Sequence, residues 1–408
     1  MATHNTTVIA GAGVIGLSSA YHLALANRQR GLDSPIVVID ALNTTFAAAS
    51  STNSGCLIPS ELDDRLKELA DYSYGIYLDH ALDKDFLNAT GLRQQSLFNI
   101  FQGSGKGQTA LPNWVKTERD WNAVLEPPTG ASASLNPKAL GHWLECRCRQ
   151  LGVEIRTSTR LQSVQLSSDS FLESVTVQHN KNTPEMIPAQ HLILAAGPWT
   201  ASLLATILPL LPIDLGFSPL AGDFLVFQNP HGLTNSSLSA VFLDSIVGHK
   251  LEFVGWNDKT IWVCAQANSS AILPEPGSFH KPDPNMISEL MAYANRFINP
   301  AHGYHGQKNP LELRVVNKGR AFRPSTKSGL PIIAAVPRTK LTHGWRSDAS
   351  DDKLSGIFVC SGHGPHGIVL GMGTGKIMSD LVLGQEPEVD ISQFGLKFKA
   401  HSEHRFHP

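Results

Sequence analysis

The sequence predicts a mixed α/β fold in which both ends of the chain build one domain and the middle contributes a second domain. Two observations lead to this prediction. A short apolar strand at residues 6–10 runs into a glycine-rich turn and a helix. Near the other end, strand 356–360 runs into a second glycine-rich turn at 361–367, and a helix follows. A βαβ start and a late return to strand–helix turns fit one domain with another inserted into it.

The first glycine-rich turn has the spacing G-x-G-x-x-G. Residues 6–16 read TTVIAGAGVIG, and the three glycines are Gly11, Gly13 and Gly16. In a dinucleotide-binding turn the first glycine allows a sharp bend, the second lets backbone N–H groups approach a pyrophosphate, and the third lets the helix pack closely on the sheet. The helix expected over Ile15–Ala26 would point the partial positive charge of its N-terminus at the phosphates.

The second strand, Ile36–Ile39, ends at Asp40. An acidic residue about 20 residues beyond the glycines accepts hydrogen bonds from an adenosine ribose. The alternative is an ordinary glycine-rich turn of an α/β protein. The strand, the glycines, the helix and Asp40 together favour a dinucleotide site over that alternative.

The remaining elements are expected in the following order. Residues 61–81 have a helical pattern, and residues 82–135 are expected to be irregular. Asn136-Pro137 starts a helix that Gly152 ends, and strands follow to about residue 180. Later segments predict strands at 191–197, 223–227, 260–264 and 332–335, a short helix from Pro198, a helix over 284–297, and a helix with Gly371, Gly373 and Gly375.

Composition and charge argue against several classes of partner. The chain has 408 residues, enough for two or three domains or two interleaved ones, and 42% are hydrophobic. A net charge of −2 without a Lys/Arg cluster argues against nucleic acid and anionic membrane surfaces. Pro209, Pro212 and Asp214 interrupt the apolar stretch 203–217, so no membrane span is expected. The N-terminus has no basic start, so we expect no signal peptide and a cytoplasmic protein.

The cysteines predict no metal site. The chain has five, at positions 56, 146, 148, 264 and 360, and none forms a Cys-x-x-Cys pair. Free thiols in a reducing compartment are therefore expected.

Four stretches, in order, carry a family likeness. They are 8–23 with Asp40, 49–55 (ASSTNSG), 192–199 (LILAAGPW), and 323–331 (RPSTKSGLP) together with 362–371 (GHGPHGIVLG). On these stretches the chain resembles FAD-dependent oxidoreductases of the D-amino-acid oxidase, glycine oxidase and sarcosine oxidase type. The resemblance implies a Rossmann-like FAD-binding domain of the glutathione-reductase-like, p-hydroxybenzoate-hydroxylase type, with an interleaved antiparallel-sheet substrate domain.

The resemblance also implies a division of the chain and a set of site residues. The FAD domain would take 1–60, 136–215 and 312–400, the substrate domain 61–135 and 216–311, and 401–408 would form a tail. The implied cofactor-binding residues are Gly11, Gly13, Val14, Ile15, Gly16, Asp40, Ala41, Ser50, Ser51, Val164, Ala196, Gly197, Trp199, Gly362, His363, Gly364, His366, Gly367 and Ile368. Arg323 matches the arginine that holds the substrate carboxylate in amino-acid-oxidising relatives, and His366 is expected to contact the flavin ring.

Two departures from the family pattern concern the surroundings of the flavin ring. Cys360 lies inside a predicted strand before Gly362, so the FAD is expected to be noncovalent. No tyrosine lies between residues 78 and 292, where D-amino-acid oxidases have substrate-binding tyrosines. His249, His363 and His366 are candidate replacements, and Lys250 or Lys259 is a candidate for action on oxygen.

The expected reaction is oxidation of a C–N bond in a small amine or amino acid, with oxygen or another acceptor taking the electrons. Two alternatives stay open. One is an NAD-dependent dehydrogenase, against which the C-terminal glycine motif and the turn at 195–199 argue. The other is a non-catalytic flavoprotein with a scaffolding or trafficking role.

Overall fold

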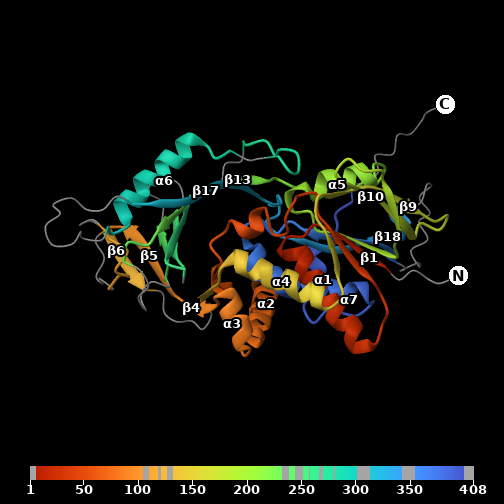
Figure 1. Cartoon of the computed structure of the whole chain (residues 1–408), viewed down its shortest axis with the longest axis horizontal. Helices are drawn as coiled ribbons and strands as arrows, with labels where there is room; N and C mark the ends of the chain where they lie inside the picture. The colour runs from red at the N-terminus through yellow and green to blue at the C-terminus, as the bar shows by residue number, and fades with distance from the viewer. Residues whose placement is uncertain are drawn as a thin grey trace.

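A computed structural model describes residues 6–103, 110–117, 121–125, 132–231, 239–243, 251–256, 258–265, 270–278, 281–300, 313–341 and 354–398. Two sheets lie at opposite ends of an elongated molecule (Figure 1). The mixed α/β class predicted from the sequence is confirmed.

The first sheet has six strands in the order β18-β19-β12-β1-β2-β8. Their bounds are β1 Thr7–Ala10, β2 Ile36–Ile39, β8 Glu154–Arg156, β12 His191–Leu194, β18 Ile332–Pro337 and β19 Leu354–Ser361. Strands β8, β2, β1, β12 and β19 run parallel, and β18 pairs antiparallel with β19. The sheet therefore combines the N-terminal βαβ unit with strands from the far end of the sequence.

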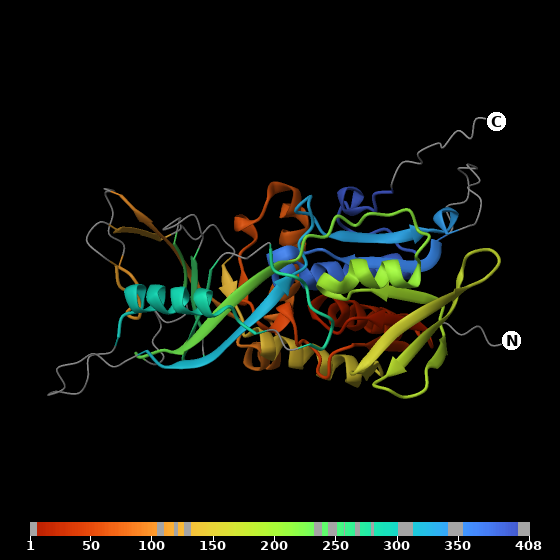
Figure 2. The same cartoon turned by 90° about the horizontal axis from the view of Figure 1, so that it is seen from above.

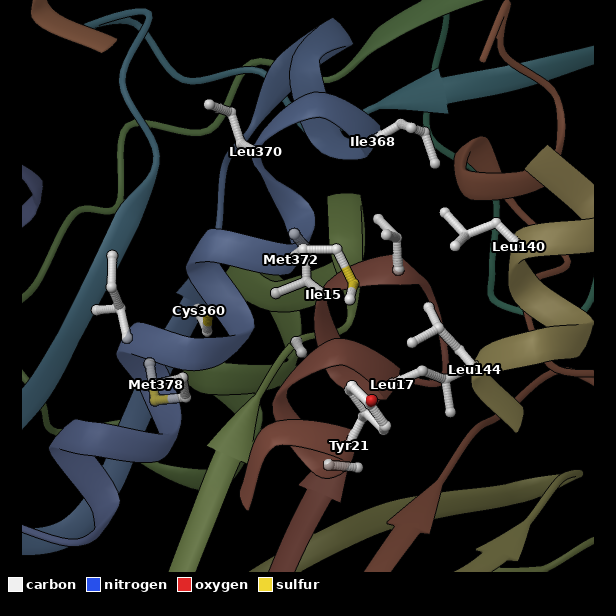
Figure 3. Close-up of a cluster of buried hydrophobic side chains, with 14 of the residues drawn as sticks. Ile15, Leu17, Tyr21, Leu140, Leu144, Cys360, Ile368, Leu370, Met372 and Met378 are labelled. Atoms are coloured by element: carbon white, nitrogen blue, oxygen red, sulfur yellow. The ribbon is translucent and has the colours of Figure 1, made fainter. Parts of the chain in front are cut away.

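Helices cover one face of this sheet. They are α1 Val14–Arg30, α2 Lys67–His80, α3 Lys84–Thr90, α4 Pro137–Gln150 and α7 Gly367–Val382. Ile9, Ile193 and Phe358 face these helices in one buried cluster. Figure 3 shows its centre, where Leu17 of α1, Leu144 of α4 and Met372 of α7 converge.

A second buried cluster lies on the opposite face of the first sheet. Val8 and Leu192, next in sequence to Ile9 and Ile193, point to this side, as the alternation of a strand requires. The covering elements are the antiparallel strands β9 Thr159–Leu166, β10 Leu172–His179 and β11 Glu185–Pro188, and helix α5 Thr200–Ile207.

The second sheet has seven strands in the order β17-β13-β16-β15-β14-β5-β6. Their bounds are β5 Ser96–Gln102, β6 Trp121–Leu125, β13 Leu220–Gln228, β14 Ser239–Leu243, β15 Leu251–Gly255, β16 Thr260–Cys264 and β17 Val315–Arg323. Neighbours pair antiparallel except β14 and β5. Helix α6 Pro284–Phe297 packs through Leu290 and Phe297 on one face, so the other face is left to face the first sheet. Figure 2 shows β13 and β17 running side by side toward the first sheet.

Short elements connect the two layers. Strands β3 Cys56–Leu57, β4 Arg93–Gln94 and β7 Ala133–Ser134 form a small sheet in the order β3-β7-β4. Strand β3 follows the segment that lies beside the start of α1, and β4 leads directly into β5 of the second sheet.

The prediction that residues 82–135 are irregular is wrong. It contains α3 and strands β4 to β7. The sequence expectation also assigned 61–135 to the substrate domain, whereas Leu69, Tyr77 and Phe86 of α2 and α3 are buried with α1 and α7 beside the first sheet. The apolar stripe of α2 is visible in the sequence, but a stripe does not reveal which layer it will pack on. The division into two domains stays a prediction.

In the described part of the chain, no helix is both long and apolar enough to cross a membrane. The same residues contain no group of three or more His, Cys, Asp or Glu side chains that could hold a metal ion.

Candidate active site

A cavity of about 670 Å³ lies between the two sheets. One end is lined by the glycine-rich turn after β1, by Asp40 and by β9. The other end is lined by the face of the second sheet and by the turn before α7. The cavity therefore joins the predicted dinucleotide turn to Arg323, the last residue of β17.

Close packing explains the glycines of the first turn. Gly11 has a φ of +118°, and a Cβ there would overlap the carbonyl oxygen of Ala195. A Cβ on Gly16 would overlap the carbonyl oxygen of Gly11. A Cβ on Gly13 would lie 3.0 Å from Ser50 Oγ. The turn thus brings bare backbone to the cavity at the start of α1, where helix N–H groups lack partners within the helix.

Ser50 marks the same end of α1. Its Oγ accepts a hydrogen bond from the Val14 backbone N–H at 3.0 Å. Ser51 points elsewhere, because its hydroxyl donates to the Ala48 carbonyl at 3.3 Å. Ser50 is therefore the serine of this segment that lies at the start of α1 and lines the cavity.

Backbone N–H groups orient the Asp40 carboxylate. Oδ2 accepts from Ala12 N–H at 2.6 Å and Oδ1 accepts from Leu42 N–H at 2.8 Å. Burial raises the pKa of Asp40 even though both hydrogen bonds oppose the rise. A carboxylate that is incompletely compensated at the cavity wall fits the hydroxyl donors of a ribose.

The segment 270–278 covers this end of the cavity. The indole Nε1 of Trp199 donates to the Pro274 carbonyl at 2.7 Å, and Arg160 Nη2 donates to the Pro276 carbonyl at 2.6 Å. Trp199 and Arg160 both line the cavity. The segment 270–278, which follows β16 of the second sheet, is thus hydrogen-bonded to residues of the first layer.

The turn before α7 forms the wall at the other end. Gly362 and Gly364 have φ values of +88° and +54°, which favour glycine. His363 Nε2 lies 3.1 Å from Thr374 Oγ1, while Nδ1 has no hydrogen-bond partner among the described residues. Burial lowers the pKa of His363 to about 3, so the ring is neutral at physiological pH. A buried, unpartnered ring nitrogen in a cavity wall fits a polar group of a bound ligand.

Arg323 reaches into the cavity from the second sheet. Its Nη2 donates to Cys264 Sγ at 3.4 Å, and the guanidinium lies over Gly222, where a Cβ would come within 3.3 Å of its Cζ. No carboxylate pairs with it in the described part of the chain. Phe224, Phe242 and Trp262 supply apolar walls on the same sheet face.

Most of the expected site residues line this one cavity. They are Gly11, Gly13, Val14, Ile15, Asp40, Ala41, Ser50, Ala196, Gly197, Trp199, Arg323, His363, Gly364, His366, Gly367 and Ile368. Gly16, Ser51, Val164 and Gly362 are outside its lining, and Leu161 and Gln162 of β9 are present where Val164 was expected.

Other lining residues carry no signal in the sequence. Arg160, Phe224, Phe242, Glu252, Trp262 and Cys264 line the cavity. Each lies on a strand with no motif, and only the pairing of the strands brings them together. His249 and Lys250 are outside the described residues. Lys259 is exposed in the turn between β15 and β16 and does not line the cavity.

The glycine turn and Asp40 fit the phosphates and ribose of a dinucleotide, and Arg323 lines the same cavity. The family described as FAD dependent oxidoreductase (DAO) matches residues 6–381. The chain therefore belongs to this family of FAD-dependent flavoproteins, as the sequence predicted. The buried Nδ1 of His363 and the backbone of Gly13 at the cavity wall fit FAD.

Relatives agree with this assignment. The chain is 22% identical to glycine oxidase of Bacillus licheniformis, over 98% of each chain. It is 24% identical to glycine oxidase of Pseudomonas aeruginosa, covering 95% of this chain and 97% of that one. The fold is similar to the crystal structure of glycine oxidase from Geobacillus kaustophilus, with a TM-score of 0.72, 19% identity, and 97% and 99% of the two chains covered.

Proposed function

We propose that this flavoprotein oxidises a C–N bond of a small amino acid or amine. The observation that carries the proposal is Arg323, a guanidinium that lines the cavity without a carboxylate partner among the described residues. A half-buried guanidinium in a mostly apolar wall is stabilised by an anionic partner, and a carboxylate matches its paired donors. An amino acid supplies that carboxylate next to the carbon that is oxidised.

The chain's residues would bind and orient the substrate rather than remove a proton with a strong base. Arg323 holds the carboxylate, and Phe224, Phe242 and Trp262 exclude water. His363 is neutral and buried, which suits a positioning role. Bound FAD supplies the acceptor for the hydride that leaves the substrate α-carbon. The resulting imine hydrolyses, and oxygen or another acceptor takes the electrons.

The cysteines support noncovalent FAD. Cys56 and Cys264 line the cavity, and burial raises the pKa of each thiol to about 11. Cys360 is fully buried in β19, and burial raises its pKa as well. Because the thiolate is the nucleophile, protonated thiols are poorly suited to attach a flavin.

Cytoplasmic location is part of the same proposal.

The test uses Arg323→Leu and Arg323→Lys in FAD-loaded protein. A panel of amines and amino acids, both enantiomers of each, is added without oxygen, and loss of the oxidised flavin absorbance is followed. We expect wild type to bleach with at least one amino acid. The leucine variant should retain FAD but show a strongly raised KM for the substrate. The lysine variant should restore substrate binding only in part, since a point charge does not reproduce the bidentate contact of a guanidinium.

Benzoate, which cannot be oxidised, reports binding alone. It should perturb the flavin spectrum of wild type and leave that of the leucine variant unchanged. Normal turnover by Arg323→Leu would make Arg323 structural. Failure of every amine and amino acid to bleach wild type would instead favour the non-catalytic flavoprotein. FAD dependence of the family removes the NAD-dependent alternative.

A further inference from the structure

Glu252 of β15 is a charged residue of the cavity that the proposed function does not yet use. Strand pairing places it in a row across the sheet face, with Phe224 of β13, Cys264 of β16 and Phe242 of β14 as register partners. Direct cross-strand partners share a face, and all four side chains line the cavity. Glu252 is therefore flanked by a thiol and a phenyl ring.

No positive charge compensates Glu252 in the described part of the chain. It forms no hydrogen bond or ion pair there, and it is half-buried. A carboxylate in a partly enclosed, mostly apolar site gains from a cation that is bound beside it. Among the described residues, the carboxylate of Glu252 therefore lacks a positively charged partner.

Arg323 lies close to Glu252 but does not neutralise it. The guanidinium donates to Cys264 Sγ, and Cys264 is the direct register partner of Glu252. Both charges act on that thiol, since Arg323 lowers the pKa of Cys264 and Glu252 raises it. Arg323 and Glu252 nevertheless form no ion pair with one another. Arg323 and Glu252 thus lie on one wall of the cavity, with Cys264 between them.

The charge of the reacting amine decides which ligand could contact both Arg323 and Glu252. A substrate carboxylate neutralises Arg323. Hydride leaves the α-carbon only when the α-amine is neutral, because its lone pair assists the departure. A cation that pairs with Glu252 during the reaction must therefore be a different nitrogen of the same substrate.

We propose that Glu252 binds a positively charged side-chain nitrogen of the substrate, so that the preferred substrates are basic amino acids. This inference rests on the proposed amino-acid oxidation and names its substrate class. Glu252 acts as a specificity-determining residue, with the carboxylate at Arg323 and the distal cation at Glu252.

The first measurement compares substrates of matched shape. Arginine is paired with citrulline, and lysine with norleucine, in both enantiomers, on FAD-loaded protein. Wild type should prefer the cationic member in kcat/KM by roughly 10–100-fold, the range of a charge-assisted hydrogen bond. Glu252→Gln should lose that preference while the neutral member changes little. Glu252→Lys should reverse the preference toward acidic side chains. Glu173→Gln, on the exposed side of β10, is the control and should behave as wild type.

The second measurement does not depend on turnover. 4-(Aminomethyl)benzoate and 4-methylbenzoate have similar shapes but differ in charge, and each is titrated against the flavin spectrum. The cationic ligand should bind more tightly to wild type, and Glu252→Gln should remove the difference. Equal affinity for both ligands in wild type would overturn the inference about Glu252. Equal losses for cationic and neutral substrates in Glu252→Gln would overturn it too. Charge-selective binding without turnover of any substrate would leave Glu252 as a cation site and overturn the proposed function instead.

Discussion

His363 is held neutral inside the protein, which links the stability of the fold to pH. Burial lowers its pKa to about 3, whereas an unfolded chain has a histidine pKa near 6.5. As pH falls below about 6.5, the unfolded state takes up a proton that the folded state does not. Stability is therefore lost with acid between about pH 6.5 and pH 3, and it is fully present above this window.

The loss of stability at acidic pH leads to a prediction for the His363→Gln variant. Between pH 7 and pH 5, the free energy of unfolding of wild type should fall by about 2 kcal/mol more than that of the variant. Urea unfolding of FAD-loaded protein at both pH values measures the difference. His142→Gln, which removes an exposed histidine, should respond to pH as wild type does. The same fall in His363→Gln and wild type would show that His363 takes up its proton in the folded state.

At the level of single residues, sequence reasoning succeeds where a motif constrains the backbone. Gly11, Asp40 and residues 363–367 line the cavity because each follows the end of a strand of the parallel sheet. Glu252 and Cys264 carry no such signal. Their relation depends on the register of β15 with β16, which two separate strands do not specify before they pair.

Helices α1 and α7 pack unusually close together, and glycines make this possible. A Cβ on Gly375 would lie 2.5 Å from both the carbonyl carbon and Cβ of Ser18. A Cβ on Gly371 would lie 2.7 Å from Val14 Cγ2, beside the first residue of α1. The glycine spacing of α7 therefore fixes the position of the helix whose N-terminus faces the cavity.

Gly375→Ala should consequently destabilise the protein and weaken FAD retention. The helices must separate, at a cost of about 1–3 kcal/mol. Gly75→Ala is the matched control, because Gly75 lies in α2 and a methyl group added there would meet nothing within 4 Å. That change should stabilise by up to about 1 kcal/mol through helix propensity. Urea unfolding measures both, and two variants of equal stability would contradict the close-packing argument.

Element predictions from the sequence depended on periodicity. Helix α6 is found at Pro284–Phe297, the range that the sequence predicted. Strand β2 at Ile36–Ile39 also matches the prediction. Strands β5 and β6 were missed because the segment 82–135 contains scattered Gly and Pro, which obscured the short strands.

At the level of the whole molecule, the cavity is lined by both sheets, so a bound cofactor contacts both layers. Any ligand of the folded state alone stabilises it by mass action. Apoprotein should therefore unfold at a lower temperature than the FAD-loaded protein. Above saturation, each tenfold increase in free FAD should add about 1.4 kcal/mol to stability.

Thermal unfolding of apoprotein at increasing FAD concentrations measures this effect. NAD at the same concentrations is the control and should leave the midpoint unchanged. In a companion measurement, acid precipitation should release the flavin into the supernatant. Flavin that stays with the precipitate would contradict the noncovalent attachment.

The interleaving of the first sheet determines when the protein can mature during its synthesis. Strand β1 is made before β12 and long before β19, yet β12 lies between these two strands in the sheet, with β19 at Leu354–Ser361. Helix α7, which packs on α1, comes later still. The face of α1 that α7 covers therefore has no partner in the growing chain until α7 is made. We expect FAD to bind only after that point, because the turn between β19 and α7 lines the cavity.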